Sequence, residues 1–179
     1  MQFTHLNLHT EFSLVDGIIR IKPLFAKLKE LGMTAIALTD LGNEFGAIKF
    51  YQEALKTGIK PLFGADVLVM DEEEKVGKVT LLAQNYQGYL NLAELLSHGY
   101  REKQIRGIPY ATPEWLTQYH EGLIIILSKE SHFGQALLNQ GEEYAQACLD
   151  TIYAPFVKDR LYLGLKRIGQ EGDEAYIQA

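Results

Sequence analysis

Short apolar runs alternate along the chain with longer stretches of helical periodicity, an order that is typical of βα units around a parallel sheet or barrel. The predicted strands cover residues 3–9, 34–39, 65–70, 76–83, 123–127 and 161–165. The predicted helices cover residues 21–31, 44–56, 86–96, 133–138, 142–156 and 173–179, with a further short helix that starts at Pro113. Neither a linker nor a repeat interrupts this order, so we predict one domain of the α/β class over residues 1–179.

The boundaries of these elements carry residue types that favour a turn or a cap. Gly32 and Gly58 follow predicted helices as C-terminal stops, and Asn85 precedes one as its N-cap. Four acids at positions 71–74 separate two apolar runs, where the polar turn of a hairpin is expected. In the first predicted strand, period-2 alternation places four side chains on one face: Phe3, His5, Asn7 and His9.

The charge balance and the single cysteine exclude several kinds of protein. Seventeen Lys and Arg against twenty-three Asp and Glu give a net charge of −6, so a domain that wraps nucleic acid is not expected. Cys148 has no second cysteine to pair with, and we predict a small buried apolar residue in a reducing compartment. The sequence has no secretory signal and no apolar run that could span a bilayer, so we expect a cytoplasmic protein without a membrane partner.

The strongest basic stretch lies within residues 101–106 and holds three cations: Arg101, Lys103 and Arg106. A solvated loop closed by Gly107 and Pro109 is the simpler interpretation, since short charge clusters are usually solvated. The alternative is that these cations contact the phosphate groups of a nucleic acid.

Polar side chains also collect near the carboxyl ends of the predicted strands, where βα architectures place functional groups. The candidates are His9, Asp16, Asp40 and Asp66. Imidazole and carboxylate groups suit zinc, iron or manganese, so this set allows a metal site. The structural alternative is that Asp40 caps a turn and that the histidines form hydrogen bonds inside a barrel.

Several segments together resemble one protein family. Residues 5–17 (HLNLHTEFSLVDG) resemble the opening motif of PHP (polymerase and histidinol phosphatase) domains, and residues 37–43 (ALTDLGN), with Gly46 and Phe50 after them, resemble the second motif. Further similar segments are residues 58–66, 81–85, 88–92 and 121–124. Within the family, the likeness is greatest to the amino-terminal PHP domains of bacterial replicative polymerases, the alpha subunits of DNA polymerase III.

The resemblance implies a distorted, TIM-barrel-like (β/α)7 barrel, truncated here to its amino-terminal part. No segment resembles a polymerase palm, so DNA synthesis would belong to a parent polymerase, through which DNA would also be reached. In such relatives the PHP domain is a docking surface for the proofreading exonuclease subunit, beside other subunits of the replicative polymerase. We therefore expect a scaffold that is itself inactive.

Metal-binding PHP domains have histidines at four positions where this chain has other residues: Asn7, Leu41, Lys78 and Ile168. Asp66 stands where these members tend to have glutamate. With these ligands lost, no cofactor is expected, because hydrolysis in the family needs the metals. The alternative is zinc or manganese at a residual site of a phosphoesterase or 3′–5′ exonuclease, and a βα domain of unrelated function is a third hypothesis.

Truncation of a barrel would leave strand edges and apolar faces uncovered, so the chain is also expected to self-associate. Without metal, the four candidate residues around His9 are expected to persist as one polar network. Neighbouring carboxylates would then raise the pKa of His9.

Overall fold

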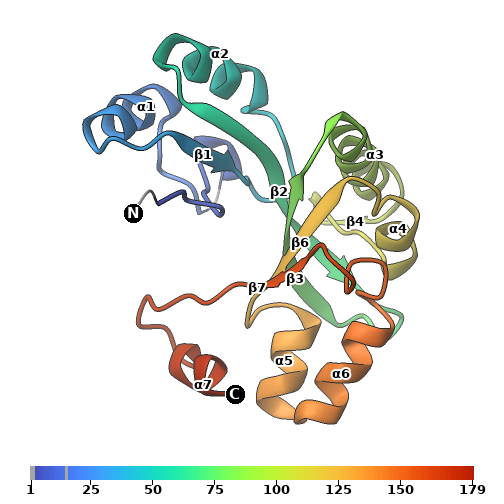
Figure 1. Ribbon diagram of the computed structural model, residues 1–179. Helices are drawn as coiled ribbons and strands as arrows, with labels where there is room; N and C mark the ends of the chain where they lie inside the picture. The colour runs from blue at the N-terminus through green and yellow to red at the C-terminus, as the bar shows by residue number, and fades with distance from the viewer. Residues whose placement is uncertain (1–2, 15) are drawn as a thin grey trace. The chain divides into compact units, whose positions relative to one another are not determined.

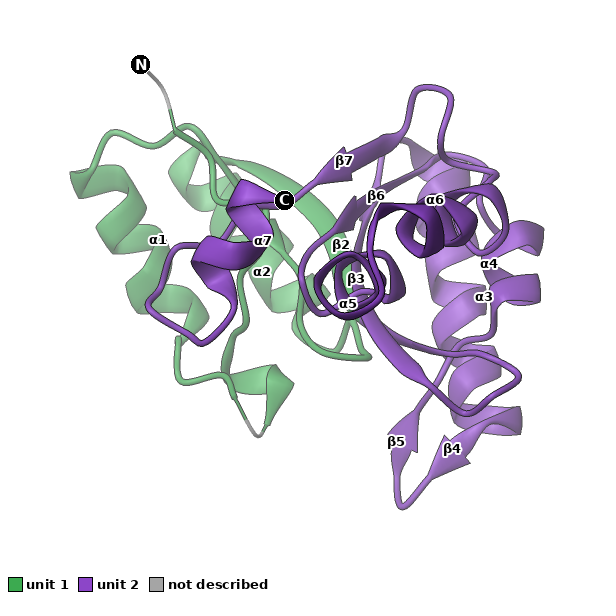
Figure 2. Cartoon of the chain, turned by 90° about the horizontal axis from the view of Figure 1, so that it is seen from below, with its two compact units in different colours: residues 1–66 green, residues 67–179 purple. Residues whose placement is uncertain are grey.

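Figure 1 shows the computed structural model of the chain, which describes residues 3–14 and 16–179. The chain forms two compact units, residues 1–66 and residues 67–179, which Figure 2 colours separately. Strand β2 (Lys60–Met70) begins in the first unit and ends in the second. Helices and strands alternate along both units, so the predicted α/β class is confirmed.

The first unit combines two helices with a parallel pair of strands. Its elements are η1 (Glu11–Ser13), α1 (Ile21–Glu30), β1 (Ala35–Leu38), α2 (Ala47–Thr57) and the first part of β2. In the β1–β2 pair, Ala35 lies opposite Lys60 and Leu38 opposite Phe63. Apolar side chains of α1, β1 and α2 form one core, in which the ring centroids of Phe25 and Phe50 are 5.0 Å apart.

The second unit is built on β3 (Val76–Ala83), β6 (Leu123–Leu127) and β7 (Leu161–Leu163). Strand β3 pairs with β6 in antiparallel orientation, and β6 pairs with β7 in parallel. The helices of this unit are α3 (Tyr86–Glu102), α4 (Pro113–Gln118), α5 (His132–Asn139), α6 (Glu142–Asp150) and α7 (Asp173–Gln178). A small hairpin joins β4 (Gln104–Ile105) to β5 (Ile108–Pro109).

Turns and caps follow the residue types that predicted them. The side chains of Asn85 and Thr112 each accept a backbone N–H of the first helical turn that follows. Gly58 caps the C-terminus of α2, and its φ of 71° is the left-handed conformation that glycine adopts at low cost. The acidic turn at residues 71–74 is confirmed, because the Asp71 carboxylate accepts the backbone N–H groups of Glu73 and of Lys75, the residue that follows the turn.

The predicted strand over residues 3–9 is wrong, because this segment forms no regular strand. Two backbone hydrogen bonds join it to β1 and the residue after it, from the N–H of Ala37 to the carbonyl of His5 and from the N–H of Thr39 to the carbonyl of Leu8. The acceptors are three residues apart and the donors two, so the regular alternation of faces is interrupted. The predicted common face is therefore broken, and His5 is exposed.

Other boundaries also differ from the prediction. Helix α6 ends at Asp150, earlier than predicted, and turns follow it. Pro155 lacks an N–H and disfavours helical backbone in the residue before it, so the helix could not have continued to residue 156. Strand β2 begins earlier than predicted, since its parallel register with β1 starts at Lys60. The predicted loop at residues 101–106 is instead the last turn of α3 followed by β4 and the tip of its hairpin. Cys148 is partly exposed rather than buried, and desolvation raises the pKa of its thiol.

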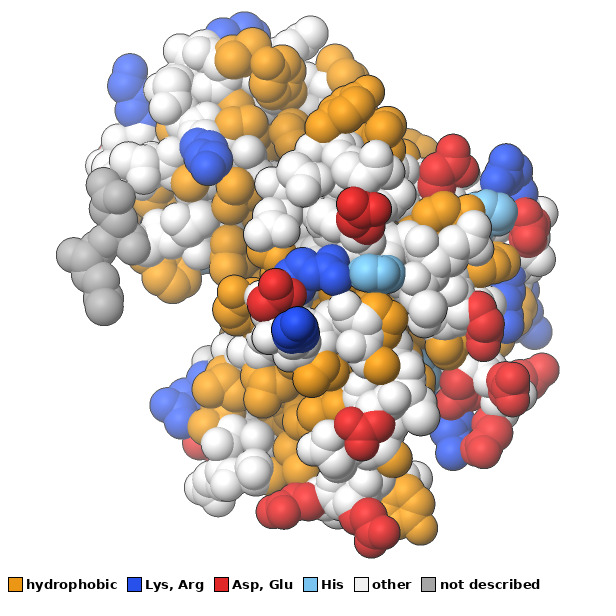
Figure 3. Space-filling view, turned by 45° about the vertical axis from the view of Figure 1, so that its right-hand side comes forward, with side chains coloured by type: hydrophobic (Ala, Val, Ile, Leu, Met, Phe, Trp, Pro, Cys, Tyr) orange, Lys and Arg blue, Asp and Glu red, His pale blue; other side chains and the backbone are white. Residues whose placement is uncertain are grey.

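The surface mixes charged and apolar side chains. Acidic and basic groups are interspersed on the face drawn in Figure 3, without a field of one sign. On α2 the side chains of Ile48, Tyr51 and Leu55 are exposed at helical spacing, and the predicted self-association would cover such residues. Among the residues that the structure describes, no helix has the length and apolar character needed to cross a membrane.

Candidate functional site

His9 lies between two carboxylates in the first unit. Its Nδ1 is 2.8 Å from Asp16 Oδ2, and its Nε2 is 2.8 Å from Asp66 Oδ2. An ionised carboxylate only accepts, so the protonated imidazole, which donates from both ring nitrogens, is the form that satisfies both contacts. Asn7 Nδ2 donates to Asp66 Oδ1 at 2.8 Å. These side chains form a continuous hydrogen-bonded array, the His9 network, which consists of Asp16, His9, Asp66 and Asn7.

Backbone pairing fixes the position of Asp66, the more buried of the two carboxylates in this network. The N–H of Asp66 donates to the carbonyl of Asp40, and the carbonyl of Asp66 accepts from the N–H of Gly42 at 2.7 Å. Leu41 forms the parallel bridge opposite Asp66. The second motif and the middle of β2 therefore meet at the site, because β1 and β2 run in the same direction.

Asp16, the more exposed of the two carboxylates, is held by the loop that follows η1. Gly17, the residue after Asp16, passes so close to Thr10 that an added Cβ would lie 1.7 Å from the Thr10 carbonyl oxygen. Any other residue would clash with this backbone. The glycine therefore allows the close turn that brings Asp16 back to His9.

Asp40 does not join the His9 network, although the sequence predicts one network of four residues. Its carboxylate is fully buried and accepts from the N–H of Thr10 at 2.6 Å, from the hydroxyl of Thr10 at 2.8 Å and from the hydroxyl of Ser13 at 2.6 Å. The Ser13 hydroxyl accepts in turn from the N–H of Leu41. Asp40 thus anchors residues 10–13 to the end of β1.

The carboxylates raise the pKa of His9 above its ordinary value of 6.5, chiefly through the hydrogen bond with Asp66. Burial of the ring opposes this shift, and the charges of Asp66 and Asp16 add to it. The Asp66 side chain is 1% exposed and that of Asp16 is 45% exposed, so solvent screens the inner pair less. The protonated imidazole is therefore favoured in the folded state.

We expect the stabilisation that His9 provides to depend on pH. Because its folded pKa is raised, this stabilisation is fully present below the unfolded pKa of 6.5 and is lost as pH rises through the folded pKa. His9→Asn should therefore flatten the fall in the free energy of unfolding on the alkaline side of that value. Urea denaturation across this pH range measures the effect. His5→Asn, at an exposed ring, is the control, and an equal flattening there would contradict the role of His9.

Lys78 and Ile168, two of the positions where metal-binding PHP domains have histidine, belong to the second unit. Lys78 Nζ is 2.9 Å from Glu130 Oε2, so its positive charge is paired. Ile168 is exposed, and its backbone N–H donates to the carboxylate of Asp173. Lys129 Nζ lies 2.5 Å from the same carboxylate, which holds the segment before α7 in place.

The donor set around His9 does not fit a bound metal ion. Both ring nitrogens of His9 face carboxylates, Leu41 offers no lone pair, and Asp40 is occupied by buried donors. Within residues 3–14 and 16–179, no group of three or more His, Cys, Asp or Glu side chains is placed to hold a metal ion. No hydrolytic step is therefore assigned to a metal at this site.

Glu44, directly after the second motif, is a partly buried acid, with its Oε1 fully covered, that the sequence pattern does not reveal. Its Oε1 has no hydrogen-bond partner in the described part of the chain, and burial raises its pKa to about 7. A glutamate between Asn43 and Phe45 is typical of a polar loop, so no local signal distinguishes it. Its burial arises only from the packing of the folded unit.

The PHP domain profile matches residues 5–168. This chain belongs to the PHP domain family, as its motifs predicted. It is 41% identical over 182 residues to DNA polymerase III subunit alpha of Pseudomonas aeruginosa, covering 100% of this chain, and 38% identical over 179 residues to that of Vibrio cholerae, covering 98%. The chain spans 15% of the length of each of these relatives.

A solved structure from Bifidobacterium adolescentis, described as that of a metal-dependent phosphoesterase, has a similar fold. The TM-score is 0.56 at 13% sequence identity, and the match covers 98% of this chain and 81% of the other. At this identity the likeness concerns the fold alone. It agrees with the α/β architecture expected of a PHP domain.

Proposed function

We propose that this chain is the PHP domain of a bacterial DNA polymerase III alpha subunit and acts as a scaffold in the replicative polymerase. Similarity over nearly the whole chain to alpha subunits of two bacteria supports this assignment. DNA synthesis would belong to the parent protein, of which the chain corresponds to a small part. The domain would then contribute by holding partners rather than by turnover.

The His9 network is the observation that favours a scaffold over a hydrolase. Metal-dependent hydrolysis requires ligands with free lone pairs and a metal that activates water. Here the imidazole of His9 bridges Asp16 and Asp66, and Asn7 satisfies the second oxygen of Asp66. The polar groups that would bind metal satisfy one another, which stabilises the end of β1 and the loop after η1.

The proposed partner is the proofreading exonuclease subunit. Proofreading requires the exonuclease to reach a mispaired 3′ end before the polymerase extends it. A scaffold that binds both enzymes raises their effective concentration, so the transfer becomes intramolecular. Holding partners in this way requires no catalysis by the His9 network. This agrees with the geometry of the network, in which the polar side chains are hydrogen-bonded to one another.

Two measurements on the purified chain test this function. Analytical ultracentrifugation with the proofreading exonuclease subunit of the same bacterium should detect a complex. Assays with added Mn²⁺ or Zn²⁺, on a phosphomonoester and on a 3′-labelled oligonucleotide, should give no more turnover than the His9→Ala variant. Failure to form the complex would contradict the scaffold, and metal-dependent turnover that is lost in His9→Ala would establish the phosphoesterase or exonuclease alternative.

A further inference from the structure

The β4–β5 hairpin projects from the second unit, as Figure 2 shows. Ile105 lies opposite Ile108 in the antiparallel pair, and Arg106 and Gly107 connect the two strands. Both connecting residues have positive φ, 53° and 82°, as in the type I′ turns that close tight hairpins. Asparagine or glycine is favoured at the first of these positions, so an arginine there does not serve the turn itself.

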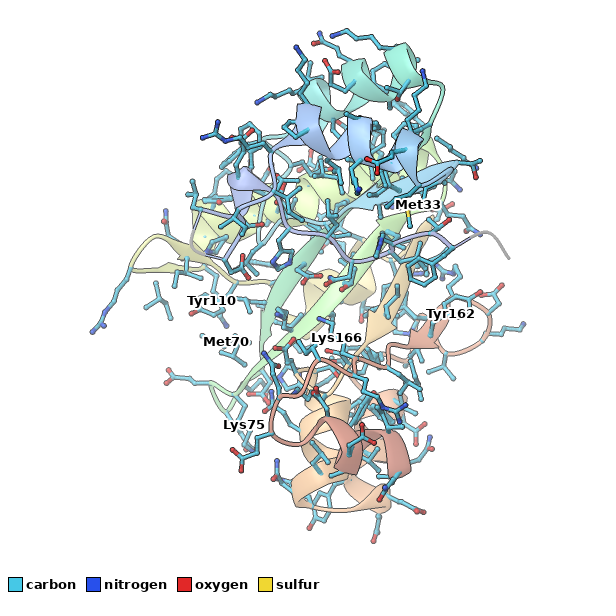
Figure 4. All side chains as sticks on the ribbon, turned by 90° about the vertical axis from the view of Figure 1, so that its left-hand side faces the viewer. Met33, Met70, Lys75, Tyr110, Tyr162 and Lys166 are labelled. Atoms are coloured by element: carbon cyan, nitrogen blue, oxygen red, sulfur yellow. The ribbon has the colours of Figure 1, made fainter. Side chains whose placement is uncertain are left out.

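The base of the hairpin is fixed by backbone hydrogen bonds. The N–H of Tyr110 donates to the carbonyl of Lys103, and Ala111 exchanges hydrogen bonds with Leu68 and Met70 on β2. Figure 4 shows Tyr110 and Met70 next to each other at this base. A projecting ribbon on a fixed base presents its side chains in a preorganised arrangement, which reduces the ordering that binding requires.

Three cations lie on this element: Arg101 in the last turn of α3, Lys103 beside β4, and Arg106 at the tip. None forms a close ion pair among the described residues, although the charge of Lys103 contributes to the lowered pKa of Glu114 on α4. Glu102 is the single acid between residues 98 and 110, and its carboxylate is 2.8 Å from His98 Nδ1. Ile105 and Ile108 are 48% and 45% exposed. The hairpin therefore combines positive charge, least compensated at Arg101 and Arg106, with a small apolar strip.

We propose that the β4–β5 hairpin binds the phosphate backbone of duplex DNA, an inference that rests on the proposed role in a replicative polymerase. A two-stranded β-ribbon fits the major groove, and cations that flank it contact phosphates. Arg106 enters the groove from the tip, while Arg101 and Lys103 contact phosphates at its edge. The net charge of −6 keeps the contact weak, so it orients DNA that other parts of the polymerase hold.

Fluorescence anisotropy with a short labelled duplex at several salt concentrations tests this contact. The chain should bind at low salt. Replacing Arg101, Lys103 and Arg106 together with glutamine should weaken binding about tenfold and reduce the salt dependence by about two to three released ions. The control variant removes the same charge from three exposed lysines that have no ion pair in the described chain: Lys22, Lys29 and Lys158.

Circular dichroism first establishes that both variants are folded. An equal loss of affinity in the two variants would overturn the proposal, as would failure of the unsubstituted chain to bind the duplex at low salt. Displacement of the duplex by a polyglutamate peptide of equal charge, at equal concentration, would also overturn it by indicating a site for an acidic protein. Binding of the exonuclease subunit is measured separately, so loss of the DNA contact is distinguished from failure of the scaffold function.

Discussion

Replacing Asp40 with alanine is expected to lower the free energy of unfolding by about 3–5 kcal/mol. The Asp40 carboxylate is fully buried and accepts both the N–H and the hydroxyl of Thr10 as well as the hydroxyl of Ser13. Alanine would leave these donors without a partner in the interior, where each unsatisfied group costs about 1–3 kcal/mol. Urea denaturation near neutral pH measures the loss.

Two further variants separate the role of Asp40 from a general effect of charge. Asp40→Asn keeps one acceptor oxygen in place and should lose less stability than Asp40→Ala. Asp16→Ala removes a carboxylate that is 45% exposed and should cost no more than about 1 kcal/mol. If Asp40→Ala were no more destabilising than Asp16→Ala, the anchoring role of Asp40 would be refuted.

Replacing Glu44 with glutamine is expected to stabilise the protein by up to about 3 kcal/mol at mildly alkaline pH. Burial raises the pKa of Glu44 from 4.5 to about 7, so the folded state favours the protonated acid. Stability should then fall as pH rises from 4.5 to about 7 and remain level above that range. Glutamine has a similar shape without the charge, and it removes this part of the pH dependence.

Chemical denaturation of the two proteins at mildly acidic and mildly alkaline pH measures this difference. Glu30→Gln makes the same charge change at a side chain that is 66% exposed and should alter stability little at either pH. If Glu44→Gln raised the free energy of unfolding by the same amount at both pH values, titration of Glu44 would be excluded as the cause. The pH range over which Glu44 changes stability differs from that of His9, whose stabilisation is lost above pH 6.5.

The pKa of His132 is shifted in the opposite direction to the pKa of His9. Burial lowers its pKa, and its ring lies 3.2 Å from the hydroxyl of Tyr153, with its other nitrogen 3.2 Å from the carbonyl of Lys75. Its stabilising contribution is therefore present above the unfolded pKa of 6.5 and is lost as pH falls below that value. The variants at Glu44 and His9 isolate their own contributions because His132 is unchanged in them.

The hydrophobic pattern was sufficient to predict the type of most elements, because each one buries an apolar face. Strand β6 is an example, since its uninterrupted apolar run lies in a sheet between two other strands. The segment 3–9 alternates like a strand but forms none. Its failure arises from the register with β1, which depends on the path of both segments and not on local propensity.

The candidate site could be predicted in part. The sequence predicts that His9 and Asp66 lie together because polar residues near the ends of parallel strands meet. The structure brings the two side chains together, although His9 is not on a strand and Asp66 lies within β2. The separation of Asp40 from them depends on the hydroxyls of Thr10 and Ser13, which are ordinary polar residues in sequence. Tertiary packing alone decides such hydrogen-bond partners, and it likewise decides the burial of Glu44.

From the irregular attachment of residues 3–9 we expect the His9 network to open locally before the core of the first unit unfolds. The backbone hydrogen bonds from Ala37 and Thr39 hold a segment that has no ladder of its own, whereas β1 remains paired with β2 on its other side. Detachment of this segment would remove Asn7 and His9 from Asp66 and Leu8 from the edge of the core, while the buried residues around Phe50 would stay packed. Hydrogen exchange at Ala37 and Thr39 would then proceed through this partial opening, and a partner that covers the segment would slow it.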